Sequence, residues 1–190
     1  TQELKRFARP GESRIEKIDL TESVRTAEKI VRPRFEETGC LLKLDLPSDP
    51  LEAETAPLRI EQILVNLLRN GADATAGEEA GEVKLHAQRQ GTELVLAISD
   101  NGPGIPEDLK ERIFDPFFST KTSSGGMGLG LAISMRLAED LGGSLSVRAN
   151  IPKGAVFELR LPALSGEKAS ERAGDSASGT RNEREPEAAE

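Results

Sequence analysis

Residues 99–134 read SDNGPGIPEDLKERIFDPFFSTKTSSGGMGLGLAIS and contain two glycine clusters on either side of a phenylalanine-rich segment. The first cluster, at 100–104, follows an apolar run, and the second, at 126–130, leads into a helical pattern. Glycines at such spacing let the backbone approach a ligand closely, because they carry no side chain. The start of a helix adds unpaired N–H groups and the positive end of a dipole, which suit phosphate. This stretch therefore predicts a nucleotide site with glycines as its walls and the loop at 119–125 as its lid.

The length and charge of the chain limit what it can be. Its 190 residues fit one domain plus tails, and a net charge of −8 argues against nucleic acid and anionic membrane surfaces as partners. A single cysteine, Cys40, excludes a disulfide framework and fits a reducing compartment. No apolar run approaches the roughly 18 residues that a membrane span needs. We expect a cytoplasmic fragment, cut within a helical pattern from a longer parent that could be attached to the inner face of the cell membrane.

The pattern of apolar residues predicts a fold of the α+β class. Short apolar or alternating runs predict strands near 15–20, 40–46, 83–87, 94–98, 145–149 and 157–161. Helical spacing predicts helices over 2–9, 57–76 and 129–141, and one between the first two strands that Asp19 or Thr21 caps and Gly39 ends. This order of elements predicts an α/β sandwich, in which helices cover one face of a mixed, mostly antiparallel sheet.

The helix predicted over 57–76 has two distinct sides. One is an apolar stripe; on another, polar residues spaced by three or four positions share a narrow arc, namely Arg59, Gln62, Asn66, Asn70 and Asp73. An asparagine side-chain carbonyl on this arc could complete an octahedral Mg²⁺ shell that otherwise consists of phosphate oxygens and water. The alternative is that the arc is simply the solvated side of an amphipathic helix.

Asp100 follows the run at 94–98, the more buried of the two strands predicted to form a hairpin around Gln90-Gly91. A carboxylate in that place can accept a hydrogen bond from an exocyclic amine, such as the amino group of adenine, and a buried bond of this kind contributes about 1.5–3 kcal/mol. Gly102 and Gly104 would let the backbone pass the base closely. The alternative is a plain Asp-Asn-Gly turn at the end of a strand, and the residues themselves leave both interpretations open.

The glycines at 126, 128 and 130 fit neither of the two commonest phosphate-binding patterns. A dinucleotide fingerprint needs a strand just before the glycines, whereas a polar loop precedes them here, and the Walker pattern is absent from the chain. Phe114, Phe117 and Phe118 lie between the glycine clusters, either as an apolar peg that pins the loop to the core or as a mobile peg on a lid. In the second case Lys121 would reach the phosphates.

Taken in order, these four elements resemble the catalytic and ATP-binding domain of sensor histidine kinases, within the superfamily that includes gyrase- and chaperone-type ATPases. Residues 61–74 look like the N box of that family, 100–105 the G1 box, 113–121 the F box and 126–134 the G2 box. The resemblance covers about residues 15–162. The Phe-Phe-Ser-Thr-Lys form of the F box resembles the subgroup of nitrogen- and dicarboxylate-responsive kinases.

The resemblance implies a Bergerat ATP-binding fold, in which Mg-ATP lies between the helices under the loop 106–127. Asn70 would ligate Mg²⁺, Asp100 would hold adenine, and Asn66 and Lys121 would take part in catalysis. The full set of ATP-binding residues implied is Asn66, Asn70, Asp73, Asp100, Gly102, Gly104, Ile105, Lys121, Gly126, Gly128, Leu129 and Gly130. Asn66 stands where related ATPases carry a glutamate that activates water. Because an amide is no useful proton acceptor, we expect phosphoryl transfer rather than rapid hydrolysis.

The resemblance also implies parts that the chain lacks. The phosphate acceptor of the family is a histidine on a dimerisation hairpin, and residues 1–11 resemble only the end of that hairpin, followed by a catalytic domain over 12–162 and a disordered tail over 163–190. The single histidine, His86, reads as an ordinary strand residue. We therefore expect ATP binding without self-phosphorylation, a homodimeric parent and a response regulator as downstream partner. The alternatives are a stand-alone ATPase of the gyrase or chaperone type and a regulator that only binds a protein partner.

Overall fold

A computed structural model describes residues 14–119 and 127–164 of the chain. Within these ranges the elements are β1 (Glu16–Asp19), α2 (Leu20–Thr38), β2 (Leu41–Asp45), β3 (Glu52–Thr55), α3 (Pro57–Ala74), β4 (Glu82–Gln90), β5 (Glu93–Asp100), α4 (Gly130–Asp140), β6 (Ser144–Ala149) and β7 (Ala155–Pro162). Two short 3-10 turns, Glu107–Leu109 and Arg112–Phe114, lie between β5 and α4. No helix in the described ranges is both long enough and apolar enough to cross a membrane.

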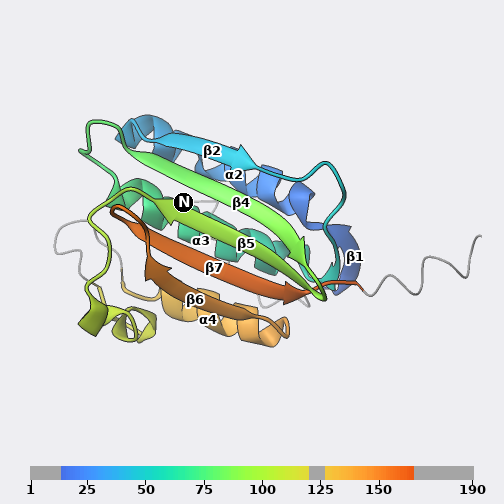
Figure 1. The fold of residues 1–190 in the computed structure, drawn as a ribbon. Coiled ribbons are helices and arrows are strands. Elements are labelled where there is room, and N and C mark those ends of the chain that lie inside the picture. Colours follow the sequence, from blue (N-terminus) through green and yellow to red (C-terminus); the bar gives the residue numbers. More distant parts are fainter. Residues whose placement is uncertain (1–13, 120–126, 165–190) are drawn as a thin grey trace, which may run out of the picture.

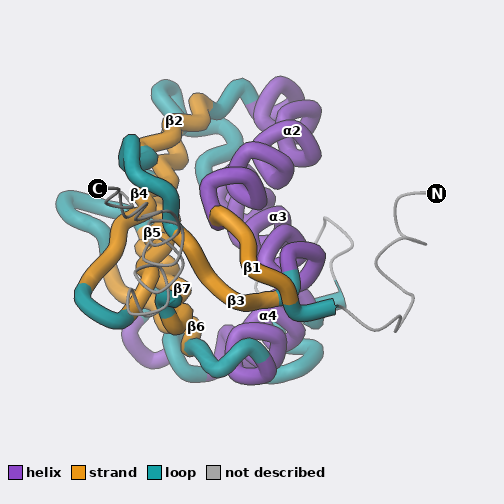
Figure 2. Tube along the Cα trace, turned by 90° about the vertical axis from the view of Figure 1, so that its right-hand side faces the viewer, coloured by secondary structure: helices purple, strands orange, loops and turns teal. Residues whose placement is uncertain are grey.

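The main sheet has five strands in the order β2-β4-β5-β7-β6. Only the pair β2–β4 is parallel, and the other three pairs are antiparallel. Figure 1 shows the sheet in front of the helices, and Figure 2 shows that α2, α3 and α4 all lie on one side of it. The predicted sandwich, a mostly antiparallel sheet with helices on one face, is therefore confirmed.

A second, two-stranded sheet was not predicted. β1 pairs with β3 in antiparallel fashion instead of joining the main sheet. The sequence gives little sign of β3, because Glu-Ala-Glu-Thr has one small apolar residue and two charges. Of the two residues predicted to cap the helix that follows β1, Asp19 is the N-cap. It accepts a hydrogen bond of 3.0 Å from the N–H of Thr21.

The core lies between the sheet and α3. The predicted apolar stripe of this helix is fully buried, and the helix packs against β4 and β5, with the side chains Ile60, Ile63, Leu64, Leu67 and Leu68 at its centre. Gly71 lets the helix approach the sheet, since a Cβ there would lie 2.9 Å from Cγ2 of Val83. Because the stripe fixes the rotation of α3, it also fixes where the polar arc points: Asn66 contacts Ser134 of α4, and Asp73 contacts Arg34 of α2.

Two of the predicted segments fall largely outside the described residues. Residues 1–11, which resemble the end of a hairpin helix, lie wholly outside, as do Lys121 and Gly126 of the predicted site. Of the predicted tail, Ala163 and Leu164 are described: their N–H groups donate to the carbonyls of Thr92 and Glu52 at 2.8 and 3.0 Å. The rest of the tail lies beyond the described part of the chain.

Candidate functional site

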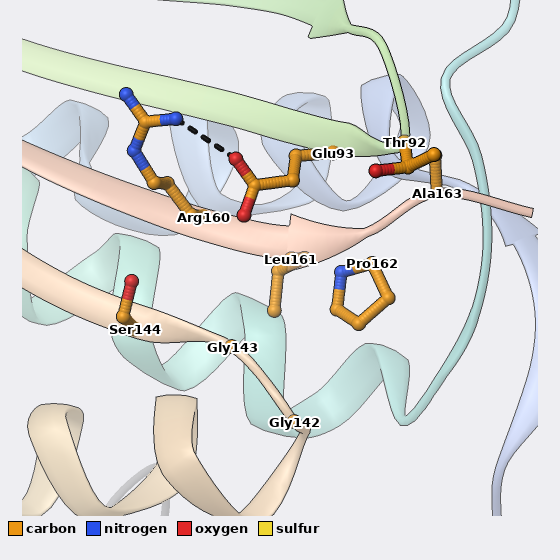
Figure 3. A pocket seen from close by; sticks show the side chains of 9 residues that line it. All are labelled: Thr92, Glu93, Gly142, Gly143, Ser144, Arg160, Leu161, Pro162 and Ala163. Carbon is orange, nitrogen blue, oxygen red and sulfur yellow. Dashed lines mark hydrogen bonds and ion pairs between the residues drawn. The ribbon is translucent and has the colours of Figure 1, made fainter.

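Two hollows of the described surface differ sharply in what lines them. The larger, about 520 Å³ and called here the end hollow, lies where β7 ends beside the start of β6 and the β4–β5 turn (Figure 3). Its charged groups are already paired, because Arg160 forms ion pairs of 2.9 Å with Glu93 and 2.6 Å with Glu158. None of the predicted site residues lines it, so size alone does not mark the site.

The smaller hollow, about 380 Å³ and called here the central hollow, lies between α3, the start of α4 and the segment after β5. Seven of the twelve predicted ATP-binding residues line it: Asn66, Asn70, Asp73, Ile105, Gly128, Leu129 and Gly130. The remaining lining is mainly apolar and includes Ile113, Phe118, Met127 and Phe157. An apolar wall with a few convergent polar groups is the usual composition of a small-molecule site.

Asp100, Gly102 and Gly104 are not part of the lining itself but form the wall beside it. Gly102 packs against Ala74, a lining residue: a Cβ on this glycine would lie 2.8 Å from the carbonyl oxygen of Ala74. Gly104 has a φ of +80°, which other residues rarely adopt, and lies against the carbonyl of Gly154. The structure thus brings the first glycine cluster next to α3. A side chain on Gly102 or Gly104 would force the neighbouring backbone segments apart.

Asp100 is a buried acid, 5% exposed, at the end of β5. Its Oδ1 accepts hydrogen bonds from the N–H groups of Gly102 at 2.9 Å and Ala155 at 3.3 Å. Burial raises the pKa of this carboxyl, and the two hydrogen bonds oppose that rise without cancelling it. Within the described ranges no donor bonds to Oδ2. One oxygen of the carboxylate is therefore fixed by the backbone, while the other keeps its acceptor capacity.

A turn that sequence reasoning passed over supports Asp100 from the other side. Asn150 donates from Nδ2 to the carbonyl oxygen of Asp100 at 2.8 Å. Gly154, with a φ of +108°, lies so close that any Cβ would overlap this same oxygen. In the sequence, residues 152–154 indicate only a turn between strands. Nothing local links them to Asp100, because the contact arises from the pairing of β5 with β7.

Three residues of the polar arc of α3 lie in a concavity instead of on an open helix face. Asn66, Asn70 and Asp73 are all half-buried and line the central hollow. Asn66 donates from Nδ2 to Oγ of Ser134 at 2.9 Å, and its Oδ1 lies against Gly130, where a Cβ would overlap it. Asn70 makes no side-chain hydrogen bond within the described ranges. Its amide is the free polar group that α3 presents to the hollow.

The start of α4 is the second glycine cluster. Its N-cap residue is Leu129, whose side chain cannot accept a hydrogen bond from the first N–H groups of this eleven-residue helix. Such N–H groups can bind an anion. Gly128 has a φ of +65°, and a Cβ there would lie 2.6 Å from the carbonyl oxygen of Phe118. This close packing joins the glycine cluster to the phenylalanine segment, where Phe118 is partly buried against the core and Phe117 is 76% exposed.

Metal-binding capacity in this region rests on amide and ligand oxygens. Among the described residues, no group of three His, Cys, Asp or Glu side chains could hold a metal ion. A Mg²⁺ ion bound with nucleotide needs only one or two protein oxygens, because phosphates and water complete its shell. The unpartnered amide of Asn70 fits that requirement. His86 lies in β4, with Nδ1 3.0 Å from Oδ2 of Asp45, and takes no part in the hollow.

Comparison with known proteins gives a consistent result. A family model described as "Histidine kinase-, DNA gyrase B-, and HSP90-like ATPase" matches residues 55–165. The C4-dicarboxylate transport sensor protein DctB of Rhizobium meliloti is 38% identical over 161 residues, which cover 85% of this chain and 25% of DctB. The chain therefore spans about a quarter of the length of this relative.

Solved structures show the same likeness in three dimensions. The catalytic domain of histidine kinase ThkA, nucleotide-free, has a TM-score of 0.70 and 33% identity, covering 78% of this chain and 95% of that one. ThkA in complex with response regulator protein TrrA has a TM-score of 0.67 and 30% identity, covering 78% and 41%. Full-length ShkA in complex with AMPPNP has a TM-score of 0.67 and 31% identity, covering 78% and 31%.

Proposed function

The chain belongs to the histidine kinase-, DNA gyrase B- and HSP90-like ATPase family, as a catalytic domain of the sensor histidine kinase type, and from this premise we propose that it binds Mg-ATP in the central hollow. The single observation that carries the proposal is the buried carboxylate of Asp100, with Oδ1 fixed and Oδ2 unbonded within the described ranges, beside a hollow where seven predicted residues meet.

At one end of the hollow, the base would bind. Oδ2 of Asp100 would accept a hydrogen bond from the exocyclic amine of adenine, which guanine lacks at that position. Gly102 and Gly104 would let the ring lie close to the backbone, and Ile105 would cover one of its faces. The fixed position of Oδ1 makes the carboxylate a rigid acceptor, so the base would be selected by geometry as well as by charge.

At the other end, the triphosphate would lie against the start of α4. Gly128, Leu129 and Gly130 would offer backbone N–H groups to the phosphate oxygens. Lys121 and Gly126, which lie outside the described residues, complete this end in the proposal. Asn66, held by Ser134 beside Gly130, would donate to or orient a phosphate oxygen.

Asn70 would hold Mg²⁺, and that ion would supply neutralisation of the phosphate charge. The chain's own part in catalysis is then to bind, orient and exclude water. Neither Asn66 nor Asn70 can accept a proton from water, so the site suits transfer to a positioned acceptor better than hydrolysis. In that transfer the bond from the γ-phosphorus to its bridging oxygen breaks, a bond to an imidazole nitrogen forms, and ADP leaves.

The acceptor histidine, the dimer and the response regulator are proposals for the longer protein. We infer an acceptor on a dimerisation hairpin of a homodimeric parent, residues 1–11 being its end. Sensor histidine kinases work with response regulators, and ThkA was solved with one, TrrA. A partner of that class is the one proposed here to receive the phosphoryl group from the histidine.

Calorimetry tests the binding step. The chain should bind the non-hydrolysable analogue AMPPNP more tightly with Mg²⁺ than without it, and GTP analogues much more weakly. Asn70→Asp is the matched control for the ion: it should keep Mg²⁺-dependent binding, whereas Asn70→Ala should lose it. Failure of the chain to bind AMPPNP at millimolar concentration contradicts the proposal.

The transfer step needs a second polypeptide. With [γ-³²P]ATP alone the chain should stay unlabelled, and it should label an added hairpin fragment of its parent only where the acceptor histidine is present. Steady release of phosphate without any acceptor would instead favour a stand-alone ATPase, which the amide at Asn66 speaks against.

A further inference from the structure

The side chain of Asn101 lies between the end of the central hollow where the base is proposed to bind and the connection from α3 to β4. It is half-buried and directly follows Asp100, the last residue of β5. Asn101 belongs to the segment that resembles the G1 box, but it is not one of the twelve residues predicted to bind ATP. Hydrogen bonds of its backbone and its side chain nevertheless join it to residues 80–82.

Two of these bonds pair Asn101 with Glu82, the first residue of β4. The backbone N–H of Asn101 donates to the carbonyl oxygen of Glu82 at 3.2 Å, as in an ordinary antiparallel ladder. In such a ladder the return bond runs from the N–H of Glu82 to the backbone carbonyl of Asn101. Here that N–H donates instead to the side-chain Oδ1 of Asn101, at 2.8 Å. The side chain therefore takes the place of the backbone carbonyl, and pairing continues one residue beyond Val83 and Asp100.

This replacement lets the main chain leave the strand immediately after Asp100. Because its carbonyl is not needed for pairing, Asn101 can turn the chain toward Gly102, which packs so closely on Ala74 that a side chain would not fit. The same turn brings the N–H of Gly102 to 2.9 Å from Oδ1 of Asp100. The orientation of the carboxylate therefore depends on where the strand ends, and Asn101 sets that end.

The remaining bond ties the turn to the connection between α3 and β4. Nδ2 of Asn101 donates to the carbonyl oxygen of Ala80 at 2.7 Å, so the amide uses both its oxygen and its nitrogen. An ionised aspartate in this position could accept a hydrogen bond from Glu82, but it would have no proton to donate to Ala80. The two contacts together therefore call for an amide.

We propose that Asn101 is a positioning residue for adenine, acting through Asp100. By ending β5 at a fixed residue and tying the turn to residues 80–82, it holds Oδ2 of Asp100 where the exocyclic amine of the base would reach it. The inference rests on the proposed function, because it assigns a further residue to recognition of the base at that same site. It makes discrimination between purines depend on a side chain whose oxygen and nitrogen both bond within the protein.

Deletion of a single group from the ligand separates this role from a structural one. Purine riboside triphosphate is ATP without the exocyclic amine, so it cannot donate to Oδ2 of Asp100. Calorimetry with Mg²⁺ on Asn101→Ala should give an affinity about tenfold lower for ATP and a change below about twofold for purine riboside triphosphate. Loss of a merely structural tie would weaken both ligands alike, so the ratio of the two affinities is the readout.

Gly77→Ala is the matched control for a disturbed connection between α3 and β4. Gly77 lies in the same connection as Ala80, has a φ of +88° and has open space around the place of its Cβ. Its replacement should lower stability through backbone strain and leave the ratio of the two affinities unchanged, because no bond to Asn101 is lost. Thermal melting of each variant establishes that it is folded.

A second substitution serves should Asn101→Ala fail to fold. Asn101→Asp keeps an acceptor for the N–H of Glu82 and loses the donor to Ala80. It should lower the ratio of the affinities for ATP and purine riboside triphosphate by about threefold.

The outcomes distinguish this inference from the one beneath it. Equal losses for the two triphosphates, or no loss of affinity for ATP, overturn the role of Asn101 while the proposed function stands. A Gly77→Ala variant with the same fall in the ratio also contradicts the inference, because any disturbance of the connection would then suffice. Absence of ATP binding by the unmodified chain overturns the proposed function instead.

Discussion

The two ends of the central hollow are built in different ways. At the base end, Asp100 is held by the backbone N–H groups of Gly102 and Ala155 and by the side chain of Asn150, that is, by its own turn and by the turn between β6 and β7. At the phosphate end, the start of α4 has no side-chain cap and Asn70 has no partner within the described ranges. The comparison teaches that protein contacts hold the base end rigid before a ligand arrives, whereas the phosphate end offers groups that a ligand would hold in place. Mutations at the base end should therefore cost stability, and those at the phosphate end should cost affinity.

The largest effect is expected from Gly154→Ala at the base end. The added Cβ would overlap the carbonyl oxygen of Asp100, and the φ of +108° is unfavourable for alanine. Together the overlap and the strained backbone should lower the free energy of unfolding by about 3 kcal/mol or more. Urea unfolding followed by circular dichroism measures this change.

Gly77→Ala is the matched control for Gly154→Ala. Gly77 also has a positive φ, +88°, but open space surrounds the place of its Cβ. Its replacement should cost only the backbone strain, about 1 kcal/mol. Equal losses in the two variants would mean that contact with Asp100 adds nothing, and the base end would not be the rigid part of the hollow.

A second test uses the titration of Asp100. Because burial raises its pKa in the folded protein, the protonated form is favoured by folding. The contribution of Asp100 to stability is then greatest below the pKa of the unfolded chain and declines as pH rises toward the raised folded pKa. Asp100→Asn removes this titration, so the stability of the variant relative to the unmodified chain should increase with pH across that window and then level off. Urea unfolding from pH 3.5 to 8 measures the difference.

The same titration should appear in nucleotide affinity. A protonated Asp100 is a poorer acceptor for an exocyclic amine, so AMPPNP binding should weaken as pH falls through the raised pKa. Asp100→Asn should bind weakly at every pH, without that dependence. A pH-independent affinity of the unmodified chain over the same range would place the base elsewhere.

At the phosphate end, Gly130→Ala should do the opposite of Gly154→Ala: it should lower the affinity for Mg-ATP while leaving stability nearly unchanged. A Cβ would overlap Oδ1 of Asn66, which is a side-chain atom that can rotate away, and alanine favours helix by about 0.5–1 kcal/mol. We expect stability within about 1 kcal/mol of the unmodified chain and an affinity for Mg-ATP about tenfold lower, because the added methyl displaces the side chain of Asn66 from beside the helix start. Thermal unfolding and calorimetry on one sample give both values.

Ser134→Ala separates the two consequences of that change. It removes the 2.9 Å hydrogen bond to Asn66 without filling any space. If it lowers the affinity as much as Gly130→Ala does, the orientation of Asn66 matters and the space beside Gly130 does not. A Gly130→Ala variant as unstable as Gly154→Ala would remove the contrast between the two ends.

Most of the fold and about half of the site follow from local sequence signals. The apolar stripe of α3 fixes its rotation, and therefore predicts that Asn66, Asn70 and Asp73 share one side. What local signals could not give are contacts made by topology. Asn150 and Gly154 reach Asp100 only because β7 pairs with β5, and Arg34 reaches Asp73 only because α2 packs beside α3.

The strand β3 was missed for a different reason. Its residues 53–55 do alternate in burial, with Ala53 and Thr55 inside and Glu54 outside. The two buried side chains are small or polar, so the sequence shows no alternation of large apolar residues that would mark a strand.

The smallest effect concerns an ion pair that joins the two turns behind the base end. Lys153 lies between β6 and β7, and its Nζ is 2.6 Å from Oε2 of Glu78, which lies between α3 and β4. Both side chains are largely exposed, so Lys153→Ala should lower stability by only about 0.5 kcal/mol, and 0.5 M NaCl should abolish the difference. AMPPNP affinity should stay unchanged, because Asn150 and Gly154 contact Asp100 directly and fix its position without this ion pair. A loss of affinity in Lys153→Ala that persists at high salt would mean that the base end needs this outer ion pair to hold Asp100 in place. The base end would then be only somewhat more rigid than the phosphate end.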